Sequence, residues 1–434
     1  MYAQVAVENV NCTFDKDYDY SIPQQLEGKA LVGCRVAVPF GIGNRKRIGI
    51  ITRLTDSTQG KRIKSISAVL DEAPLLSNEM MSLARWISEQ TFCTYYEAVK
   101  AMLPAGINHK IIRSFCAVPG VDESIVASLD SDEKQVYDYL LSRSGYVKTE
   151  NFLKTLGFDV SSDIPERLLK AGLLAANDDA VRNIGDNNIR MVRLCEGSDD
   201  VSMTKKQSEV VNVLKDVGSV SVKELCYFTG YTPSVISALE KKGVVECFER
   251  EELRSFVSRY AVQSAYDSGK IHLTDEQQKA YDGLLEDYKS GTGKTALLYG
   301  VTGSGKTSVY LKLIDAVLAD NKTVIVMVPE ISLTPQTLSV FHSRYNDGVA
   351  VFHSALSAGE RADEWKRVKN GDAKIVIGTR SAVFAPLENI GLIIIDEEQE
   401  HTYKSEQTPR YNAKSVARYR AAWHKGLTLL ASAT

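Results

Sequence analysis

Short, fully apolar runs alternate with helical patterns over the last third of the chain, from about residue 265. Such runs are typical of strands covered on both faces, and the helices between them supply the crossovers of a parallel sheet. The expected strands are Ala296–Tyr299, Val324–Val328, Val349–Phe352, Ile375–Ile377, Leu392–Ile395 and Leu427–Leu430. The expected helices are Ser308–Leu318, Leu333–Tyr345, Ser357–Lys369 and Ala413–His424. The pattern predicts an α/β lobe over residues 265–434.

The N-terminal pattern is different and predicts a small β-rich domain over residues 1–112. Short β-branched runs separated by glycine and proline lie at Tyr2–Val7, Arg35–Val38 and Arg47–Ile51. Residues 75–103 then repeat apolar side chains, Phe92 included, at helical spacing, and Pro104 and Gly106 follow. We therefore expect one helix over 75–103.

Residues 113–258 contain the same pattern twice, in units at about 131–180 and 204–250. Each unit reads as three helices followed by a strand, which is the order of a winged helix. Winged helices bind DNA or serve as protein-contact modules, and both roles stay open here. The helix expected at 164–170 carries Arg167 and Lys170 against Glu166. Residues 176–202 between the units read as an acidic, polar link.

Composition narrows the class of protein. A length of 434 residues predicts about three domains. The net charge of −3 excludes a globally basic, histone-like protein but not a local basic patch. The seven cysteines are scattered without a C-x-x-C pair, and no signal peptide is apparent, so we expect a cytoplasmic protein with reduced thiols and no zinc site in these residues. No apolar run approaches the roughly 20 residues of a membrane span, so we expect no membrane partner.

A phosphate-binding loop lies at Gly300–Thr307, between an expected strand and an expected helix. Glycines let the backbone N–H groups face a polyphosphate, and the helix N-terminus adds its positive dipole end. Lys306 is expected to reach the β- and γ-phosphates of ATP, and the Thr307 hydroxyl to ligate Mg²⁺. The ATP-binding residues expected here are Gly300, Thr302, Gly303, Ser304, Gly305, Lys306 and Thr307.

Acidic residues follow another apolar strand, at Asp396, Glu397 and Glu398. The carboxyl edge of a parallel sheet is where ligands bind. We expect Asp396 to hold Mg²⁺ opposite Thr307, and Glu397 to orient and deprotonate the attacking water. Lys306, Asp396 and Glu397 are thus the expected catalytic residues.

Two segments near the same edge have the composition of a DNA contact. Thr379, Arg380 and Ser381 offer charged and hydroxyl donors to a nucleic-acid backbone. The loop at 400–411 is aromatic and basic, so its rings are expected to stack on bases and to couple DNA binding to Glu397. An ordinary surface loop with Tyr411 in the core is the alternative. The residues concerned are Tyr403, Lys404, Arg410 and Tyr411.

The N-terminal domain concentrates basic residues against a weakly acidic chain. Aromatic residues, Phe14, Tyr18 and Tyr20, precede them. Cations for phosphates and rings for bases suit single strands and strand ends, whereas the alternative is a solvated basic loop. The basic residues are Arg35, Arg45, Lys46, Arg47, Arg53, Lys61, Arg62 and Lys64.

These segments, in this order, resemble the motifs of superfamily 2 helicases, which makes the α/β lobe RecA-like. Gln277, ahead of the phosphate loop, stands where such enzymes place a glutamine that reads adenine. The runs GVTGSGKT, VPEISLTPQ, IGTRSAVFAP and IIDEE, with Tyr18–Pro23 and Gly33–Gly41, resemble the PriA family of replication-restart helicases. The resemblance implies a domain that binds the 3′ end of a leading strand, with Tyr18, Asp19, Tyr20 and Gly41 near the pocket, and a winged-helix domain before the helicase lobe.

The sequence departs from the family at its acidic box and at its end. Gln399 replaces the usual histidine, and we expect it still to hydrogen-bond toward a γ-phosphate or a partner motif. The chain stops at the third helicase motif, Ser432-Ala433-Thr434, whereas the family continues with a zinc-binding insertion and a second lobe that supplies arginine fingers. We therefore expect this chain to bind DNA ends and, weakly, ATP, but neither to unwind DNA nor to hydrolyse ATP well.

The resemblance implies an ATP-dependent 3′-to-5′ DNA helicase, a hydrolase that recognises stalled or repaired replication forks and starts primosome reassembly. Its implied partners are forks, single-stranded DNA, primosome proteins and the single-stranded-DNA-binding protein, in the cytoplasm at the nucleoid. One alternative is a non-catalytic fork-binding or primosome docking module. Another is a different superfamily 2 fork translocase. Affinity for forks with a free or a blocked 3′-hydroxyl separates the PriA-like function from the other translocase. A Lys306→Ala substitution separates the helicase from the docking module, because ATPase should vanish in the full-length protein while fork binding survives.

Overall fold

The computed structural model describes residues 1–41, 43–58, 62–121, 123–182, 188–195, 202–251 and 271–433. It contains two compact units, one formed by residues 1–183 with 257–434 and the other by residues 184–256. None of the helices within those described ranges is both long enough and apolar enough to cross a membrane.

The chain begins with a six-stranded, mostly antiparallel sheet, as the β-branched runs predict. Its strands are β1 (Tyr2–Val7), β2 (Tyr18–Ser21), β3 (Arg35–Phe40), β4 (Arg45–Thr55), β5 (Lys64–Ser65) and β6 (Ala68–Val69). Their order is β5-β2-β1-β4-β3-β6. Side chains on one face, among them Val5, Val36 and Ile51, form its core.

The single helix expected over 75–103 is wrong, because two helices occupy this segment. They are α1 (Asn78–Thr91) and α2 (Tyr95–Met102). Thr94 starts the second helix through a capping box with Glu97, and Phe92 ends the first in the left-handed region, at φ 53°. The Phe92 ring is 89% exposed rather than on the apolar face, so a strong local cap overrides the helical periodicity.

The middle of the chain repeats one element order, strand, helix, short strand, two helices, strand. The first copy is β7 (His109–Ala117), α4 (Ser131–Leu141), β8 (Val147–Lys148), α5 (Thr149–Leu156), α6 (Ile164–Lys170) and β9 (Leu174–Arg182), with the short helix α3 (Glu123–Ala127) before α4. The second is β10 (Asn188–Leu194), α7 (Lys205–Val217), β11 (Ser219–Ser221), α8 (Val222–Thr229), α9 (Pro233–Lys241) and β12 (Val245–Glu251). Sheet orders β8-β7-β9 and β11-β10-β12 correspond, and each copy has its own core.

The polar link expected at 176–202 is also corrected. Strand β9 runs through its first part, paired with β7 from Leu174 to Arg182, and β10 lies within the second part. Asn177, Asp178 and Asp179 belong to a strand because a long antiparallel partner supplies their backbone hydrogen bonds. Asp186 lies outside the described residues.

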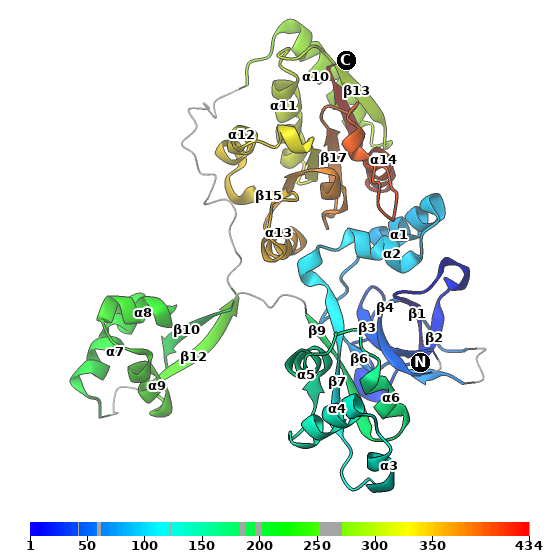
Figure 1. Cartoon of the computed structure of the whole chain (residues 1–434). Coiled ribbons are helices and arrows are strands. Elements are labelled where there is room, and N and C mark those ends of the chain that lie inside the picture. The colour runs from blue at the N-terminus through cyan, green and yellow to red at the C-terminus, as the bar shows by residue number, and fades with distance from the viewer. Residues whose placement is uncertain are drawn as a thin grey trace. The chain divides into compact units, whose positions relative to one another are not determined.

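The C-terminal lobe is the predicted parallel α/β fold, with helices on both faces of its sheet (Figure 1). Its strands are β13 (Thr295–Tyr299), β14 (Thr323–Met327), β15 (Val349–Phe352), β16 (Ile375–Gly378), β17 (Ile390–Ile395) and β18 (Leu427–Ser432), in the order β13-β18-β17-β14-β16-β15. Its helices are α10 (Asp275–Lys289), α11 (Lys306–Ala319), α12 (Pro335–Tyr345), α13 (Ala358–Asn370) and α14 (Ala413–His424). The edge strand β13 departs most from the expected burial, with Leu297 60% and Tyr299 67% exposed.

Helices α1 and α2 share a hydrophobic core with this lobe. At the joint, Arg420 is fully buried and donates to Glu79 at 2.8 Å and 3.0 Å. Gly106 lies so close to α13 that an added Cβ would be 2.1 Å from the Ala358 carbonyl oxygen. The joint is therefore packed as tightly as a domain interior.

Candidate functional site

The phosphate loop joins β13 to α11 in the geometry that its glycines permit. Gly305 precedes the helix at φ +81°, a value that favours glycine. Lys306 Nζ donates to the carbonyl oxygens of Gly300 at 2.5 Å and Val301 at 3.3 Å. The Thr307 side chain is exposed in the first turn of α11, and Thr302, Gly303 and Ser304 are exposed in the loop.

The structure brings Gln277 against this loop from α10. Its Nε2 donates to the Ser304 carbonyl oxygen at 2.9 Å, and its backbone N–H is capped by Thr274. A capping box fixes Gln277 at the start of α10. The side chain therefore lies beside the loop although it is 27 positions away in the sequence.

Asp396 and Glu397 follow β17 at the same carboxyl edge. Asp396 accepts from its neighbour's backbone, with Glu397 N 3.0 Å from Oδ1, and Tyr310 Oη lies 3.5 Å from Oδ2. Burial raises the pKa of the Asp396 carboxyl, with the nearby Glu397 charge adding to the rise and hydrogen bonds and Lys306 opposing it. Glu397 has φ +47°, which is costly for a residue with a side chain and typical of functional positions.

Gln399 connects the acidic box to the end of the neighbouring strand. Its Nε2 donates to Glu397 Oε2 at 2.6 Å, and its Oε1 accepts from Ser432 Oγ at 3.1 Å. Ser432 ends β18, which lies between β13 and β17. The expectation that Gln399 hydrogen-bonds a partner motif is confirmed, and the contact holds the Glu397 carboxylate in one orientation.

A pocket of about 530 Å³ lies farther along the lobe. Five of the residues expected to contact DNA line it, together with Glu330, His353 and Arg361, which no DNA-contact prediction named. Arg380 donates to the carbonyl oxygens of Thr402 at 3.2 Å and Lys404 at 2.5 Å. Burial lowers the pKa of His353, which favours its neutral form near pH 7. The expected residues lining the pocket are Thr379, Arg380, Ser381, Lys404 and Tyr411.

The stacking role expected for Tyr403 and Tyr411 is corrected, because both rings are buried. Tyr403 is 1% exposed, and its hydroxyl donates to the Asp396 carbonyl oxygen at 2.6 Å. Tyr411 is 8% exposed and packs edge-on against Phe384, with ring centroids 4.7 Å apart. Neither ring has a free face for a base. Arg410 and Lys404 are exposed, as a DNA contact requires.

Aromatic and basic residues also meet in the N-terminal sheet. Tyr18 packs edge-on against Phe40, with ring centroids 5.0 Å apart, and the Arg47 guanidinium lies 4.7 Å from the centroid of the Phe40 ring. Lys64 Nζ donates to the Gly41 carbonyl oxygen at 2.6 Å. The structure thus gathers Tyr18, Gly41 and Arg47 at the ends of β3 and β4.

Tyr20 and Asp19 lie on opposite sides of β2, as neighbours on a strand do. Tyr20 is in the core, and its hydroxyl donates to the Pro39 carbonyl oxygen at 3.1 Å. Burial raises the pKa of Tyr20 to about 12, so the hydroxyl stays protonated. Asp19 accepts from Thr58 at 2.6 Å and is 3.4 Å from Gln4 Nε2.

Arg35 is not part of a surface basic patch. It is 2% exposed, and its guanidinium pairs with Asp71 at 2.7 Å and donates to the Ile107 carbonyl oxygen at 2.7 Å. Its role is structural because no phosphate can approach it. Arg53 and Arg62 are exposed, whereas Lys61 lies outside the described residues.

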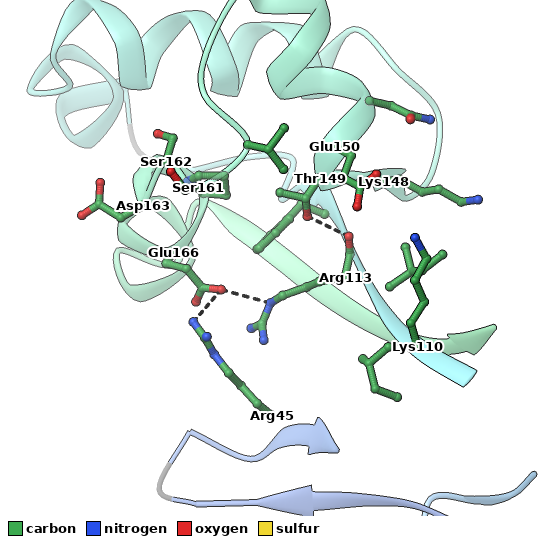
Figure 2. Close-up of a pocket in the computed structure, with 16 residues that line it drawn as sticks. Arg45, Lys110, Arg113, Lys148, Thr149, Glu150, Ser161, Ser162, Asp163 and Glu166 are labelled. Carbon is green, nitrogen blue, oxygen red and sulfur yellow. Dashed lines mark hydrogen bonds and ion pairs between the residues drawn. The ribbon is translucent and has the colours of Figure 1, made fainter. Parts of the chain in front are cut away.

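Arg45 pairs with a carboxylate of α6, whereas the Lys46 side chain bonds a backbone carbonyl oxygen of β9. Figure 2 shows Glu166 of α6 between Arg45 and Arg113, with Oε1 2.8 Å and 3.2 Å from their nitrogens. Lys46 Nζ donates to the Asp178 carbonyl oxygen at 2.7 Å. The sequence held no local sign of this pairing, since the partners are more than a hundred positions apart.

Family models match two parts of the chain. Residues 4–104 match the 3′ DNA-binding domain (3′BD) of PriA, and residues 274–434 match the DEAD/DEAH box helicase family. The second match implies the use of ATP and a divalent metal ion. A solved structure of RecG bound to a three-way DNA junction is 26% identical over a part covering 38% of this chain and 22% of that chain, with a TM-score of 0.30.

Curated relatives match the whole length of the chain. The replication restart protein PriA of Bacillus subtilis is 36% identical, covering 100% of this chain and 53% of the relative. That of Synechocystis is 32% identical, with 96% and 50% covered, and that of Chlamydia pneumoniae is 29% identical, with 100% and 48% covered. The chain spans about half the length of these relatives. With the two family models matched in order, the chain belongs to the PriA family of replication restart proteins.

Proposed function

We propose that this chain supplies the ATP site and the DNA-end site of an ATP-dependent 3′-to-5′ DNA helicase that acts at stalled or repaired forks and starts primosome reassembly. The observation that carries the proposal is the row of groups along one sheet edge. The phosphate loop, the Ser432–Gln399–Glu397 chain of hydrogen bonds and the Arg380 pocket all belong to it. Nucleotide chemistry and DNA contact share one rigid sheet in this arrangement.

ATP binds at the phosphate loop in this proposal. Lys306 sits on neutral carbonyl oxygens and is available to the β- and γ-phosphates. Gln277, beside the loop, reads adenine. Thr307 and Asp396 supply a hydroxyl and a half-buried carboxylate, the oxygen ligands that Mg²⁺ prefers. When bound there, Mg²⁺ neutralises charge that develops on the phosphates.

Glu397 is the proposed general base. The hydrogen bond from Gln399 fixes one of its carboxylate oxygens and leaves the other for a water proton. Because Gln399 also bonds Ser432, a shift at the end of β18 changes the position of the base.

DNA binds next to the hydrolytic groups in this proposal. Thr379, Arg380 and Ser381 contact the backbone, and Lys404 and Arg410 extend the contact. Tyr403 is buried, so in this proposal it does not stack on a base but links DNA binding to the metal site. Its hydroxyl donates to the Asp396 carbonyl oxygen, and its loop carries the cations that contact DNA. Movement of that loop is thereby transmitted to the metal-binding residue.

The N-terminal domain, residues 1–112, binds the 3′ end of a strand near Tyr18, Asp19, Tyr20 and Gly41 in this proposal. Arg45, Lys46 and Arg47 add contacts to phosphates. The match of residues 4–104 to the 3′ DNA-binding domain family supports this assignment.

Residues 113–258 form two winged-helix units, about 131–180 and 204–250, ahead of a helicase lobe at 265–434. In the first unit, α6 is the position of a recognition helix, but Arg167 pairs with Glu133 at 3.2 Å and Glu166 pairs with two arginines. Because these charges are already paired within the protein, we propose that α6 packs against the protein and does not insert into DNA as a recognition helix.

The relatives are about twice as long as this chain, and the remaining parts of the proposed helicase belong to that additional length. They comprise a second lobe with arginine fingers and a zinc-binding insertion. Primosome proteins and the single-stranded-DNA-binding protein are proposed partners, at the nucleoid.

A Lys306→Ala substitution tests the proposal. We expect the affinity for MgATP, measured by calorimetry, to fall at least about tenfold, because charge-assisted contacts to two phosphates are lost. Fork-DNA affinity should stay unchanged. ATP binding that is undetectable in both forms would instead favour the docking module, and equal ATP affinity would contradict the assigned site.

A further inference from the structure

A pocket of about 590 Å³ lies between the start of β4 and the first proposed winged-helix unit, where β7, α5 and α6 line it. The residues assigned to ATP binding and hydrolysis take no part in it. Arg45, Lys110, Arg113 and Lys148 line it, together with the hydroxyl groups of Thr149, Ser161 and Ser162 (Figure 2). Ion pairs are absent for Lys110 and Lys148 within the part of the chain that the structure describes. Two of the four cations that line the pocket are therefore not neutralised by a carboxylate of the described residues.

Two guanidinium groups from distant elements converge on one point in this pocket. Arg45 comes from β4 and Arg113 from β7, and their nitrogens are 2.8 Å and 3.2 Å from the same oxygen, Oε1 of Glu166. Two guanidinium groups on one acceptor form a cradle for an anion with several oxygens. Glu166 occupies that cradle from within the chain.

Glu166 fits the cradle poorly. Nε of Arg113 is buried and, among the described residues, has no well-aligned hydrogen bond, although Glu166 Oε1 is only 3.2 Å away. The Glu166 side chain is 26% exposed, so it can rotate out toward solvent. A phosphate group carries its charge on oxygens spread tetrahedrally, which offers an acceptor to each arginine.

Other carboxylates face the same pocket but do not occupy the cradle. Glu150 is exposed, and Asp163 is 78% exposed and 3.6 Å from Arg167. Asp178 does not line the pocket, and one of its carboxylate oxygens lies 3.6 Å from Nη1 of Arg113. Glu166 alone among these lies between both arginines.

We propose that this pocket binds a phosphate group of the DNA backbone in place of Glu166, and that Glu166 is a built-in competitor that lowers DNA affinity. The inference rests on the proposed DNA-end function of the N-terminal domain. It assigns a second phosphate site to the strand that this domain holds, and it makes Glu166, 120 positions from the basic turn, a determinant of affinity.

The test is the binding of a labelled single-stranded oligonucleotide with a free 3′ end to the whole chain, over a range of salt concentrations. Glu166→Gln should bind about threefold to tenfold more tightly at low salt, because the carboxylate that pairs with both Arg45 and Arg113 is removed and only Asp178, 3.6 Å from Arg113, remains. Its plot of log K against log salt should steepen by about one phosphate contact. Chemical denaturation of the variant checks that it is folded, so that the gain is not due to exposed basic segments.

Glu150→Gln is the matched control, since it removes the same charge from the same pocket without touching the arginines. It should bind within about twofold of the unmodified chain. Adding Arg113→Gln to Glu166→Gln should abolish the gain. Equal affinities for the Glu166 and Glu150 variants would overturn the inference, as would a gain that survives the loss of Arg113. A chain that binds no DNA in any form would overturn the proposed DNA function itself.

Discussion

The phosphate loop and the basic turn at Arg45 both present cations for phosphates, but they hold those cations differently. Lys306 rests on two carbonyl oxygens, and among the described residues it has no ion pair with a carboxylate. Arg45 is 2.8 Å from Glu166. A carbonyl is neutral and is easily exchanged for a phosphate oxygen, whereas a carboxylate must be displaced as an anion. ATP binding is therefore expected to depend on local geometry, and DNA binding on a competition.

The Arg420–Glu79 ion pair is buried, in contrast to the exposed Arg45–Glu166 pair, and its loss gives the largest expected effect on stability. Replacing Arg420 by Met leaves Glu79 buried without its partner, which costs about 3–5 kcal/mol of unfolding free energy. Chemical denaturation measures the loss. Arg45→Met, at an exposed pair, should change stability by at most about 1 kcal/mol. Equal losses in the two variants would remove the distinction between the joint and the basic turn.

The same buried pair predicts loss of stability in acid. Burial alone raises the pKa of Glu79, but Arg420 and His424 outweigh burial and lower it to about 2. Because the pKa is depressed in the folded state, this stabilisation is present above about pH 4.5 and is lost as the pH falls toward 2. The loss is on the order of 3 kcal/mol. Unfolding measured from pH 6 to pH 2.5 should show it, and Glu79→Gln should lack this component.

A substitution of Gln399 tests whether ATP hydrolysis depends on the local geometry that hydrogen bonds impose on Glu397. Gln399→Ala removes the bonds to Glu397 and Ser432. We expect the rate of ATP hydrolysis to fall about tenfold, a part of the roughly 10²–10⁴ that a general base contributes. Affinity for MgATP should be unchanged. A fall in affinity with no change in rate would show that Gln399 contacts the nucleotide instead of positioning the base.

The smallest effect compares two exposed arginines. Arg410 has no ion pair in the described part of the lobe, whereas Arg45 is paired. Arg410→Gln should weaken single-strand binding about twofold to fivefold and reduce the salt slope by about one. Arg45→Gln should weaken it less, because the native pair must first be broken. Fluorescence anisotropy at several salt concentrations measures both, and the reverse ranking would contradict the competition.

Fixed-spacing motifs and buried apolar runs predicted the α/β lobe and the placement of its loops well. Each strand from β13 to β18 overlaps an expected run. Burial explains the continuous apolar signal of β14 to β18, whereas β13 is apolar in sequence but largely exposed. The phosphate loop and the acidic box are local, so their neighbours in sequence are also their neighbours in space.

Which side chains are buried or paired could not be predicted, because this depends on partners that are distant in sequence. Arg35 and Arg45 look alike in a basic sequence. Arg35 is buried and paired with Asp71, whereas Arg45 is exposed and paired with Glu166. The sequence around Tyr403 predicts a ring that stacks on bases, but in the structure this ring is buried. Phe92 matched the helical spacing, yet the Thr94 cap ended the helix there. Composition indicates which charges and rings exist, and only the fold decides which of them face solvent.

We propose, as the central point, that this chain recognises a DNA 3′ end through its N-terminal domain and carries an ATP site in its helicase lobe. The most direct measurement is the affinity of the 434-residue chain for fork DNA whose leading strand carries either a free or a blocked 3′-hydroxyl. We predict tighter binding to the free end, and loss of this preference when Asp19 is replaced by Ala. Equal affinity for the two forks would contradict the account.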